Sequence, residues 1–278
     1  MVDMTHAIWT LRSAFAALGL MFGTWLGLIP WVRDARALSH DQVGLALLCA
    51  GIGGLVTFPL VRHLLAGYGS ARLTIASGAV MACLVPLIAL APSLWLLCAC
   101  LFAVGIPAAA MDVAINAQAV VQERSASRSL MSRFHACWSL GALSGALGVG
   151  LALSWHIPPW LYMLGVCAMC AAVLLVNSQA LMSEPRDANS PRRAPRMQWQ
   201  GPVMMVGAMV VCAYVVEGAV SDWSGLYMRD IVGVSLAQAP TAYAAFSFAM
   251  VGGRLFGDQV IERVGNVRVL QASGGSAA

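Results

Sequence analysis

A chain of 278 residues in which 60% of side chains are hydrophobic and 10% are charged is no soluble domain, since about a quarter of the residues of soluble domains are charged. The mean hydropathy of +0.78 instead predicts a polytopic membrane protein. The net charge is +4, and all sixteen basic residues are arginine, which excludes a retinal Schiff base or any other lysine chemistry.

Eight runs of the sequence are apolar over a length that can cross a bilayer, which takes about 20 residues in a helix. They are residues 13–32, 43–61, 73–90, 94–121, 135–154, 160–176, 202–222 and 239–256. The first run exceeds the roughly 7–15 apolar residues of a signal-peptide core, so we expect a true span although Ala35-Arg36-Ala37 follows it. All eight cysteines lie within these runs, where helix packing is expected and neither disulfides nor a zinc site.

The arginines are divided unequally between the two sides of the predicted membrane. If the N-terminus is inside, thirteen arginines are cytoplasmic and three are outside, namely Arg33, Arg36 and Arg229. Cytoplasmic loops carry an excess of basic residues, so the N-terminus is predicted to be cytoplasmic. The positive charge is explained by this distribution and does not indicate binding to nucleic acid.

A polar segment rich in proline and arginine separates the sixth and seventh runs. Residues 177–200 show no apolar periodicity, which predicts a flexible cytoplasmic linker. The linker divides an N-terminal six-helix bundle, residues 1–176, from the start of a C-terminal bundle, residues 201–278.

The sequence also contains an internal repeat across this linker. Gly69, Arg72 and Ala76-Ser77-Gly78 match Gly265, Arg268 and Ala272-Ser273-Gly274 at an offset of 196 residues. The second and third spans are therefore repeated as the eighth and ninth. We expect a fragment of a protein roughly twice 196 residues long, an all-α membrane helix bundle of six-plus-six inverted repeats in which the second half has two spans and the beginning of a third.

Asp112 and Asn116 interrupt the fourth apolar run. A carboxylate near the bilayer centre costs roughly 3 kcal/mol on insertion scales, so an acid at this depth is a functional hypothesis. Four residues make just over one helical turn, so the two side chains share a face, and the alanines around them allow neighbouring helices to approach closely. We expect this face to look into a bundle, with Asp112 carrying a proton and Asn116 lining the path. The alternative is an inter-helix hydrogen bond that only orders the bundle.

Two further polar residues are candidates for the same path. Glu217 is a second membrane acid, and at 1.5 Å per residue it lies about 21 Å along the helix from Val203, in the predicted outer half. His135 lies at the cytoplasmic mouth of the fifth span, where an imidazole that titrates near neutrality can share protons with Asp112. The alternative for His135 is a helix cap.

Three tryptophans lie away from the ends of the predicted spans. Trp25, Trp138 and Trp223 are candidates to stack on the apolar face of a sugar in the substrate path. Aromatic rings also fill gaps between helices or anchor at the membrane interface, and that alternative stays open for all three.

The segment after the eighth span resembles the signature loop of the major facilitator superfamily. Gly253-Arg254-Leu-Phe-Gly257-Asp258, followed by Arg263-Val-Gly265, carries the resemblance, and these residues are expected to form a gate between spans eight and nine, with Gly257 and Asp258 clasping Arg263. The alternative is a solvated turn. The first-half copy departs from the pattern, because Arg62 stands where the repeat offset places Asp258.

Within that superfamily three segments resemble the fucose-permease-like branch. MDVAINAQ, residues 111–118, is similar to its fourth helix, which carries an acid followed four residues later by Asn. YVVEGAVSDWSGLY, residues 214–227, is similar to its seventh helix and contains Glu217, and FHACWSLGALSG, residues 134–145, is similar to its fifth. The first helix carries only the neutral FGTWLGLIP, whereas sugar symporters of this branch have an acid there.

The resemblance implies a secondary transporter of a small solute, sugar-like or another small organic molecule, that is coupled to protons and works by alternating access. It implies a bacterial-type inner membrane, a monomer, and no partners beyond solute, protons and lipid. No cofactor or metal is expected. An enzyme is disfavoured because the spans carry no HExxH, no Gly-x-Ser-x-Gly and no paired acidic metal motif. A transport-inactive receptor or assembly subunit derived from a transporter remains the alternative.

Overall fold

The computed structural model describes residues 4–127, 129–181, 201–265, 268–269 and 271–272, and of 180, 202, 206, 258, 261 and 262 it describes the backbone only. In this part of the chain each of the eight predicted runs forms a helix, the last of them from Thr241 onward. The helices are α1 (Met4–Ala35), α2 (His40–Tyr68), α3 (Ser70–Leu90), α4 (Leu94–Ala126), α5 (Met131–Ser154), α6 (Pro159–Val176), α7 (Gly201–Tyr227) and α8 (Thr241–Val264). Two short helical turns, η1 (Ser178–Ala180) and η2 (Met228–Val232), follow α6 and α7. Most of the predicted linker, residues 182–200, lies outside the described residues.

Seven of the described helices are long and apolar enough to cross a membrane. They are α1 to α6 and the helix formed by α7 and η2, which agrees with the first seven predicted spans. α8 is not among the seven. Its less apolar sequence includes Arg254 in the middle and Arg263 in the last turn, so its role as an eighth span stays a prediction.

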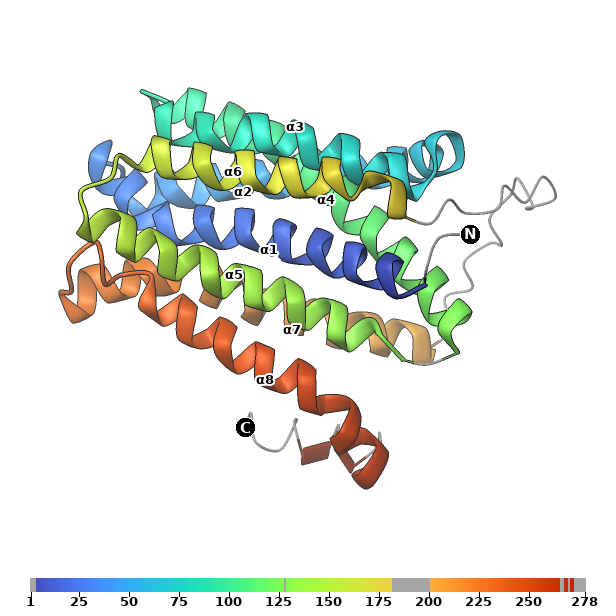
Figure 1. The fold of residues 1–278 in the computed structure, drawn as a ribbon. Coiled ribbons are helices and arrows are strands. Elements are labelled where there is room, and N and C mark those ends of the chain that lie inside the picture. Colours follow the sequence, from blue (N-terminus) through green and yellow to red (C-terminus); the bar gives the residue numbers. More distant parts are fainter. Residues whose placement is uncertain (1–3, 128, 182–200, 266–267, 270, 273–278) are drawn as a thin grey trace.

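The helices lie roughly along one direction, with α1 at the centre (Figure 1). α1 packs along α5, α2 packs on α4, and α3 packs on α4 and α6. The second half joins this bundle mainly by packing α8 against α5 and α7 against α1. We call the end that holds the α1–α2 and α7–α8 connections the hairpin end, and the opposite end, where α1 begins, the N-terminal end.

Glycines bring α1 and α5 into backbone contact. A Cβ atom added at Gly19 or Gly23 of α1 would clash with the carbonyl groups of Trp138 and Ala142 of α5. Gly141 and Gly145 of α5 face the α1 backbone in the same way, with no room for a side chain. Small residues spaced four apart on both helices therefore produce this contact, as in membrane proteins where close packing drives helix association.

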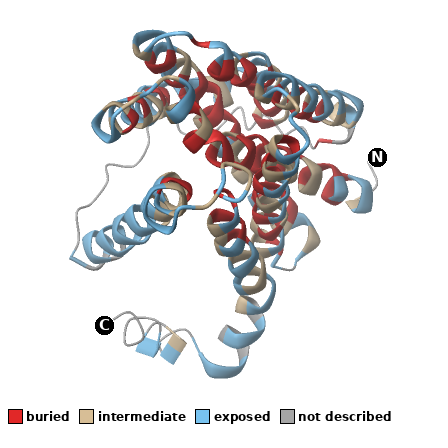
Figure 2. Cartoon of the chain, turned by 90° about the vertical axis from the view of Figure 1, so that its left-hand side faces the viewer, coloured by how far each residue is buried: buried red, intermediate tan, exposed pale blue. Residues whose placement is uncertain are grey.

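Burial is concentrated in the first six helices. Buried residues gather on α1 and on the helix faces around it, whereas α7 and the end of α8 are mostly exposed (Figure 2). The largest fully buried side chains include Phe15, Leu18 and Met21 of α1, together with Phe134 of α5. This core fixes the positions of α4 and α5, which carry the candidate polar residues of the first half.

The structure gives the two copies of the internal repeat the same local geometry. Gly69 and Gly265 both have positive φ angles, of 78° and 87°. Each carbonyl accepts a hydrogen bond from the backbone amide four residues later, Leu73 at 3.1 Å and Val269 at 3.2 Å. Glycine is favoured at both positions because other residues adopt such φ angles only with strain.

The repeat is also visible at the opposite end of the same helices. Ser39 precedes α2, and its backbone amide donates to the side-chain oxygen of Gln42 at 3.0 Å. At the equivalent residues the amide of Ser235 donates to Gln238 at 3.3 Å. α1 and α7 both run toward this hairpin end, so the 196-residue repeat is a parallel one and not inverted.

Candidate functional site

Asp112 and Asn116 lie beside the buried face of α4 rather than on it. Met111, Ala114 and Ile115 are fully buried, whereas Asp112 is exposed and Asn116 is half-buried. Ala108, Ala110 and Ala114 are buried. Asp112, on the face that we expected to look into a bundle, lies about 100° around the helix from Met111 and does not point into the first bundle. At 1.5 Å per residue it is about 21 Å from the last residue of α4, near the middle of the helix.

A chain of polar contacts begins at Asp112. The side-chain amide of Asn116 donates to the carbonyl oxygen of Asp112 at 2.9 Å and reaches its carboxylate Oδ1 at 3.4 Å. The Oδ1 atom of Asn116 lies 3.1 Å from Nε2 of His135 on α5. The ring of His135 packs edge-on against Phe15 of α1, at 5.2 Å between centroids. The structure therefore brings Asp112, Asn116 and His135 together, with Asn116 between the other two.

Arg254 extends these contacts into the second half of the chain. Its Nη1 atom donates to the carbonyl oxygen of His135 at 3.2 Å and to the hydroxyl of Ser139 at 2.5 Å. Its Nη2 atom lies 3.6 Å from a carboxylate oxygen of Glu217 on α7, and its guanidinium lies 5.6 Å from the ring centroid of Trp138. A single side chain of α8 thus connects α5 to α7.

The position of Arg254 corrects the interpretation of the signature segment. Residues 253–258 belong to α8, which continues to Val264, and do not form a loop between two spans. Arg254 reaches α5 from within α8, so its partners are His135 and Ser139 and not residues at the end of the bundle. Arg263 is exposed near the end of α8. The side chain of Asp258 lies outside the described residues, so the proposed clasp with Arg263 and Gly257 stays a prediction.

The three candidate tryptophans occupy different places. Trp138 lies under Arg254, and its ring also packs against Phe22 at 6.1 Å. Trp25 is half-buried and packs against the two largest apolar clusters. Trp223 lies toward the hairpin end, stacked on His40 at 6.4 Å and away from the contacts of Arg254. Only Trp138 is placed directly among the polar residues.

Between this site and the hairpin end the two halves meet through apolar side chains. We call this group the apolar seal; its members are Leu26, Ile29, Val43, Ala142, Ala146, Leu226, Tyr243 and Ala244. They come from α1, α2 and α5 of the first half and from α7 and α8 of the second. Leu226 is 2% exposed, so the seal leaves little access from the hairpin end.

Beyond the seal lies a cluster of charges that the sequence analysis missed as a unit. Arg33 and Asp34 end α1, and Arg229 and Asp230 lie in η2. Arg33 pairs with Asp230, and Arg229 pairs with Asp34 at 3.1 Å. The signal for it was present in the sequence, because the Arg-Asp pairs at 33–34 and 229–230 stand at the same 196-residue offset as the glycines.

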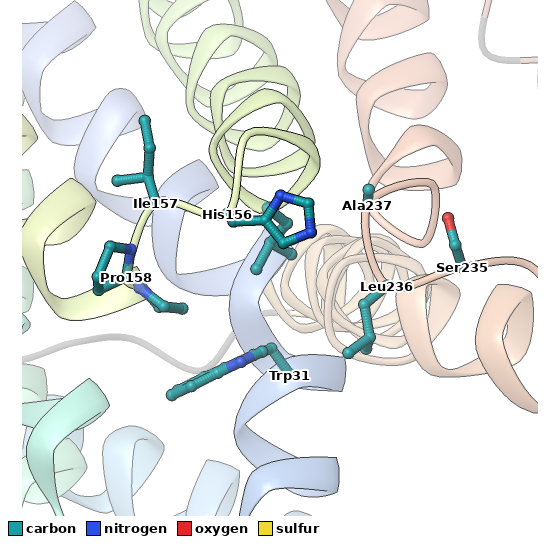
Figure 3. A pocket seen from close by; sticks show the side chains of 9 residues that line it. Trp31, His156, Ile157, Pro158, Ser235, Leu236 and Ala237 are labelled. Atoms are coloured by element: carbon teal, nitrogen blue, oxygen red, sulfur yellow. The ribbon is translucent and has the colours of Figure 1, made fainter.

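An open pocket of about 440 Å³ lies at the same end of the molecule. Trp31, the His156-Ile157-Pro158 turn and the Ser235-Leu236-Ala237 segment line it (Figure 3). The turn connects α5 to α6, and the segment connects α7 to α8. Ala237 also contacts α5, because its carbonyl lies where a side chain at Gly150 would be. The pocket is therefore a surface hollow between the two halves, remote from Asp112.

The comparison with protein families decides what this fold is. The family model described as the Major Facilitator Superfamily matches residues 13–278. The chain belongs to this superfamily. The resemblance stated from the signature segment is thereby confirmed at the level of the superfamily.

Individual proteins are similar over most of the chain. An uncharacterized MFS-type transporter of Yersinia pestis is 32% identical over 93% of this chain and 67% of its own length. The uncharacterized transporter y4wD of Sinorhizobium fredii is 30% identical over 95% of this chain and 70% of its own. The membrane protein MosC of Rhizobium meliloti is 28% identical, and the matched region is 94% of this chain and 63% of MosC.

A solved structure agrees with this assignment of the fold. The nucleoside transporter NupG superposes with a TM-score of 0.66 over 93% of this chain and 68% of its own, at 12% sequence identity. The chain therefore has the fold of a facilitator and spans about two thirds of the length of the proteins it matches. The identity to NupG is too low to carry more than the fold.

Proposed function

We propose that this facilitator is a secondary active transporter of a small organic solute, driven by protons and working by alternating access. The observation that carries the proposal is the chain of contacts from Asp112 through Asn116 and His135 to Arg254 and Glu217. It joins two membrane acids, one from each half, through the residues that must separate when the halves move.

Asp112 is assigned the proton in this mechanism. Of the two acids in the chain of contacts, Glu217 has Arg254 within 3.6 Å, whereas the Asp112 carboxylate contacts the neutral side-chain amide of Asn116 at 3.4 Å. In a membrane a carboxylate without a fixed cation is most simply neutralised by a proton. Asn116 and His135 would pass the change in charge to α5, and Trp138 with Ser139 would form the wall against which the solute binds.

The proposal also gives the molecule an orientation. The N-terminal end is placed in the cytoplasm and the hairpin end outside a bacterial-type inner membrane, following the distribution of arginine. In this orientation the apolar seal closes the outer side of the site.

The test is solute-dependent proton movement in liposomes that contain the full-length protein and a pH-sensitive dye. A panel of monosaccharides and nucleosides is added outside, and one of them is expected to acidify the interior. Asp112→Asn should abolish this signal while solute exchange continues, because asparagine keeps the shape and hydrogen bonding of the neutral acid. Asp41→Asn, an exposed acid at the hairpin end, is the control. Proton movement by Asp112→Asn at the parent rate would exclude Asp112 as the proton carrier, and a protein that binds solute without exchange or flux would be the transport-inactive receptor.

A further inference from the structure

The charge cluster at the hairpin end is built from the same dipeptide twice. Each half supplies an arginine followed by an aspartate at the end of its first helix, Arg33-Asp34 in α1 and Arg229-Asp230 in η2. Each arginine pairs with the aspartate of the other half, and Arg33 also contacts its own neighbour Asp34 at 2.6 Å. The arrangement is self-complementary, since the same surface is presented by two parallel copies of one repeat.

The backbone around the cluster differs from an ordinary helix end. α7 passes into the π-helical turn η2, which holds Arg229 and Asp230, and ends at Gly233 with a φ angle of 77°. Arg229 is fixed further by donating to the carbonyl oxygen of Val234 at 3.0 Å. Single π turns within helices occur frequently at functional sites, because they turn side chains out of their regular positions.

The cluster lies over the apolar seal and shields it from the hairpin end. Leu26 and Ile29 of the seal come from the last two turns of α1 before Arg33, and Leu226 lies one turn before Asp230. Beside the cluster His40 approaches Asp230 at 2.9 Å and stacks on Trp223. Opening the seal from this end therefore requires the two ion pairs to break.

We propose that the reciprocal pairs Arg33–Asp230 and Arg229–Asp34 are the latch of the outer gate, which holds the structure in its outward-closed state. The proposal rests on the orientation given under the proposed function. The side chains are 12% to 36% exposed, and ion pairs with this exposure are weak, which suits a contact that breaks in each transport cycle. Their duplication places the two pairs where the ends of α1 and α7 meet.

The latch is tested by the access of reagents to the seal, which needs no solute. Leu226→Cys is introduced into the full-length protein, and intact cells are treated with a membrane-impermeant maleimide, with the parent as the background for the native cysteines. Asp34→Asn and Asp230→Asn are each expected to raise the labelling rate of Cys at position 226 by about three- to tenfold, because they shift the population toward the open state. Asp41→Asn is the matched control and should leave the rate unchanged. Equal rates in all variants, or an equal rise with Asp41→Asn, would overturn the proposal.

A charge exchange separates a latch from a general loss of structure. Asp34→Arg alone places three arginines where α1 meets η2, so the helices should separate and the cysteine introduced by Leu226→Cys should be labelled fast. Asp34→Arg with Arg229→Asp gathers both arginines on α1 and both aspartates on η2, so the attraction between the helices returns and labelling should again be slow. Labelling of the double variant as fast as that of Asp34→Arg would refute the latch. Because labelling is measured without transport, a protein that shows the pattern but moves no protons would leave the latch standing and overturn the proposed function alone.

Discussion

Arg254→Gln is expected to destabilise the protein by about 2–3 kcal/mol, because this side chain makes the polar connection between α5, α7 and α8. The separation of 3.6 Å from Glu217 corresponds to an attraction of roughly 4–5 kcal/mol at an effective dielectric constant of about 20. The two side chains are 21% and 30% exposed, so desolvation and screening offset most of it and about 1–2 kcal/mol remains as coupling. The hydrogen bonds to His135 and Ser139 account for the rest of the expected loss.

The measurement is a double-mutant cycle of Arg254→Gln and Glu217→Gln, followed by thermal unfolding of the full-length protein in detergent. The double variant should be more stable than the sum of the two single losses predicts, by about 1–2 kcal/mol. Arg263→Gln serves as the control, since Arg263 is exposed on the same helix and its loss should change stability by less than about 0.5 kcal/mol. A coupling energy of zero, or an Arg254→Gln variant as stable as the control, would show that the contact contributes nothing to the fold.

Four further outcomes are expected. Gly23→Leu should lower stability by about 1–3 kcal/mol or prevent folding, because any Cβ there meets the backbone of Ala142, whereas Gly165→Leu, with open space around it, should be tolerated in the same thermal assay. His135→Phe should slow proton-coupled flux without reducing the amount of protein in the membrane, since the ring would keep its contact with Phe15 but lose the one with Asn116. Asp258→Asn should slow the exchange between states more than it weakens solute binding, measured as a fall in turnover at unchanged solute affinity, and equal turnover would contradict it. Neutralising Arg192, Arg193 and Arg196, which lie outside the described residues, should leave solute affinity unchanged, and a large rise in KM with normal insertion would count against their purely topological role.

The helices of this chain could be predicted well from sequence because bilayer length and apolar composition determine them. The run at 94–121 became α4 (Leu94–Ala126) and the run at 160–176 became α6 (Pro159–Val176). Helix ends in the aqueous region were less certain. Hydropathy marks where a helix leaves the membrane, whereas hydrogen bonding marks where it ends, so α1 and α2 extend several residues beyond the predicted runs.

The candidate site was predicted in part. A spacing of four residues placed Asn116 next to Asp112, but no sequence pattern within one helix could reveal that Arg254 reaches His135, 119 residues away. The signature segment was interpreted as a loop because it resembles the signature loop of the superfamily, whereas the structure continues α8 through it. The ion pairs of Arg33 and Arg229 could have been predicted from the repeat, since equivalent residues at the ends of two parallel helices meet at one end of the bundle.

The glycine contact between α1 and α5 also decides where this protein can bend. Backbone atoms touch directly at Gly23 and Gly145, so neither helix can slide or roll against the other without breaking contacts along the whole crossing. α1 and α5 must therefore move as one rigid body. α8 packs against α5, and α7 packs against α1, so both helices of the second half contact this rigid pair. When the second half rocks, it moves against α1 and α5 as one body. A change at the Arg254 contact can therefore affect the Arg33–Asp230 pair without a change in the shape of the first bundle.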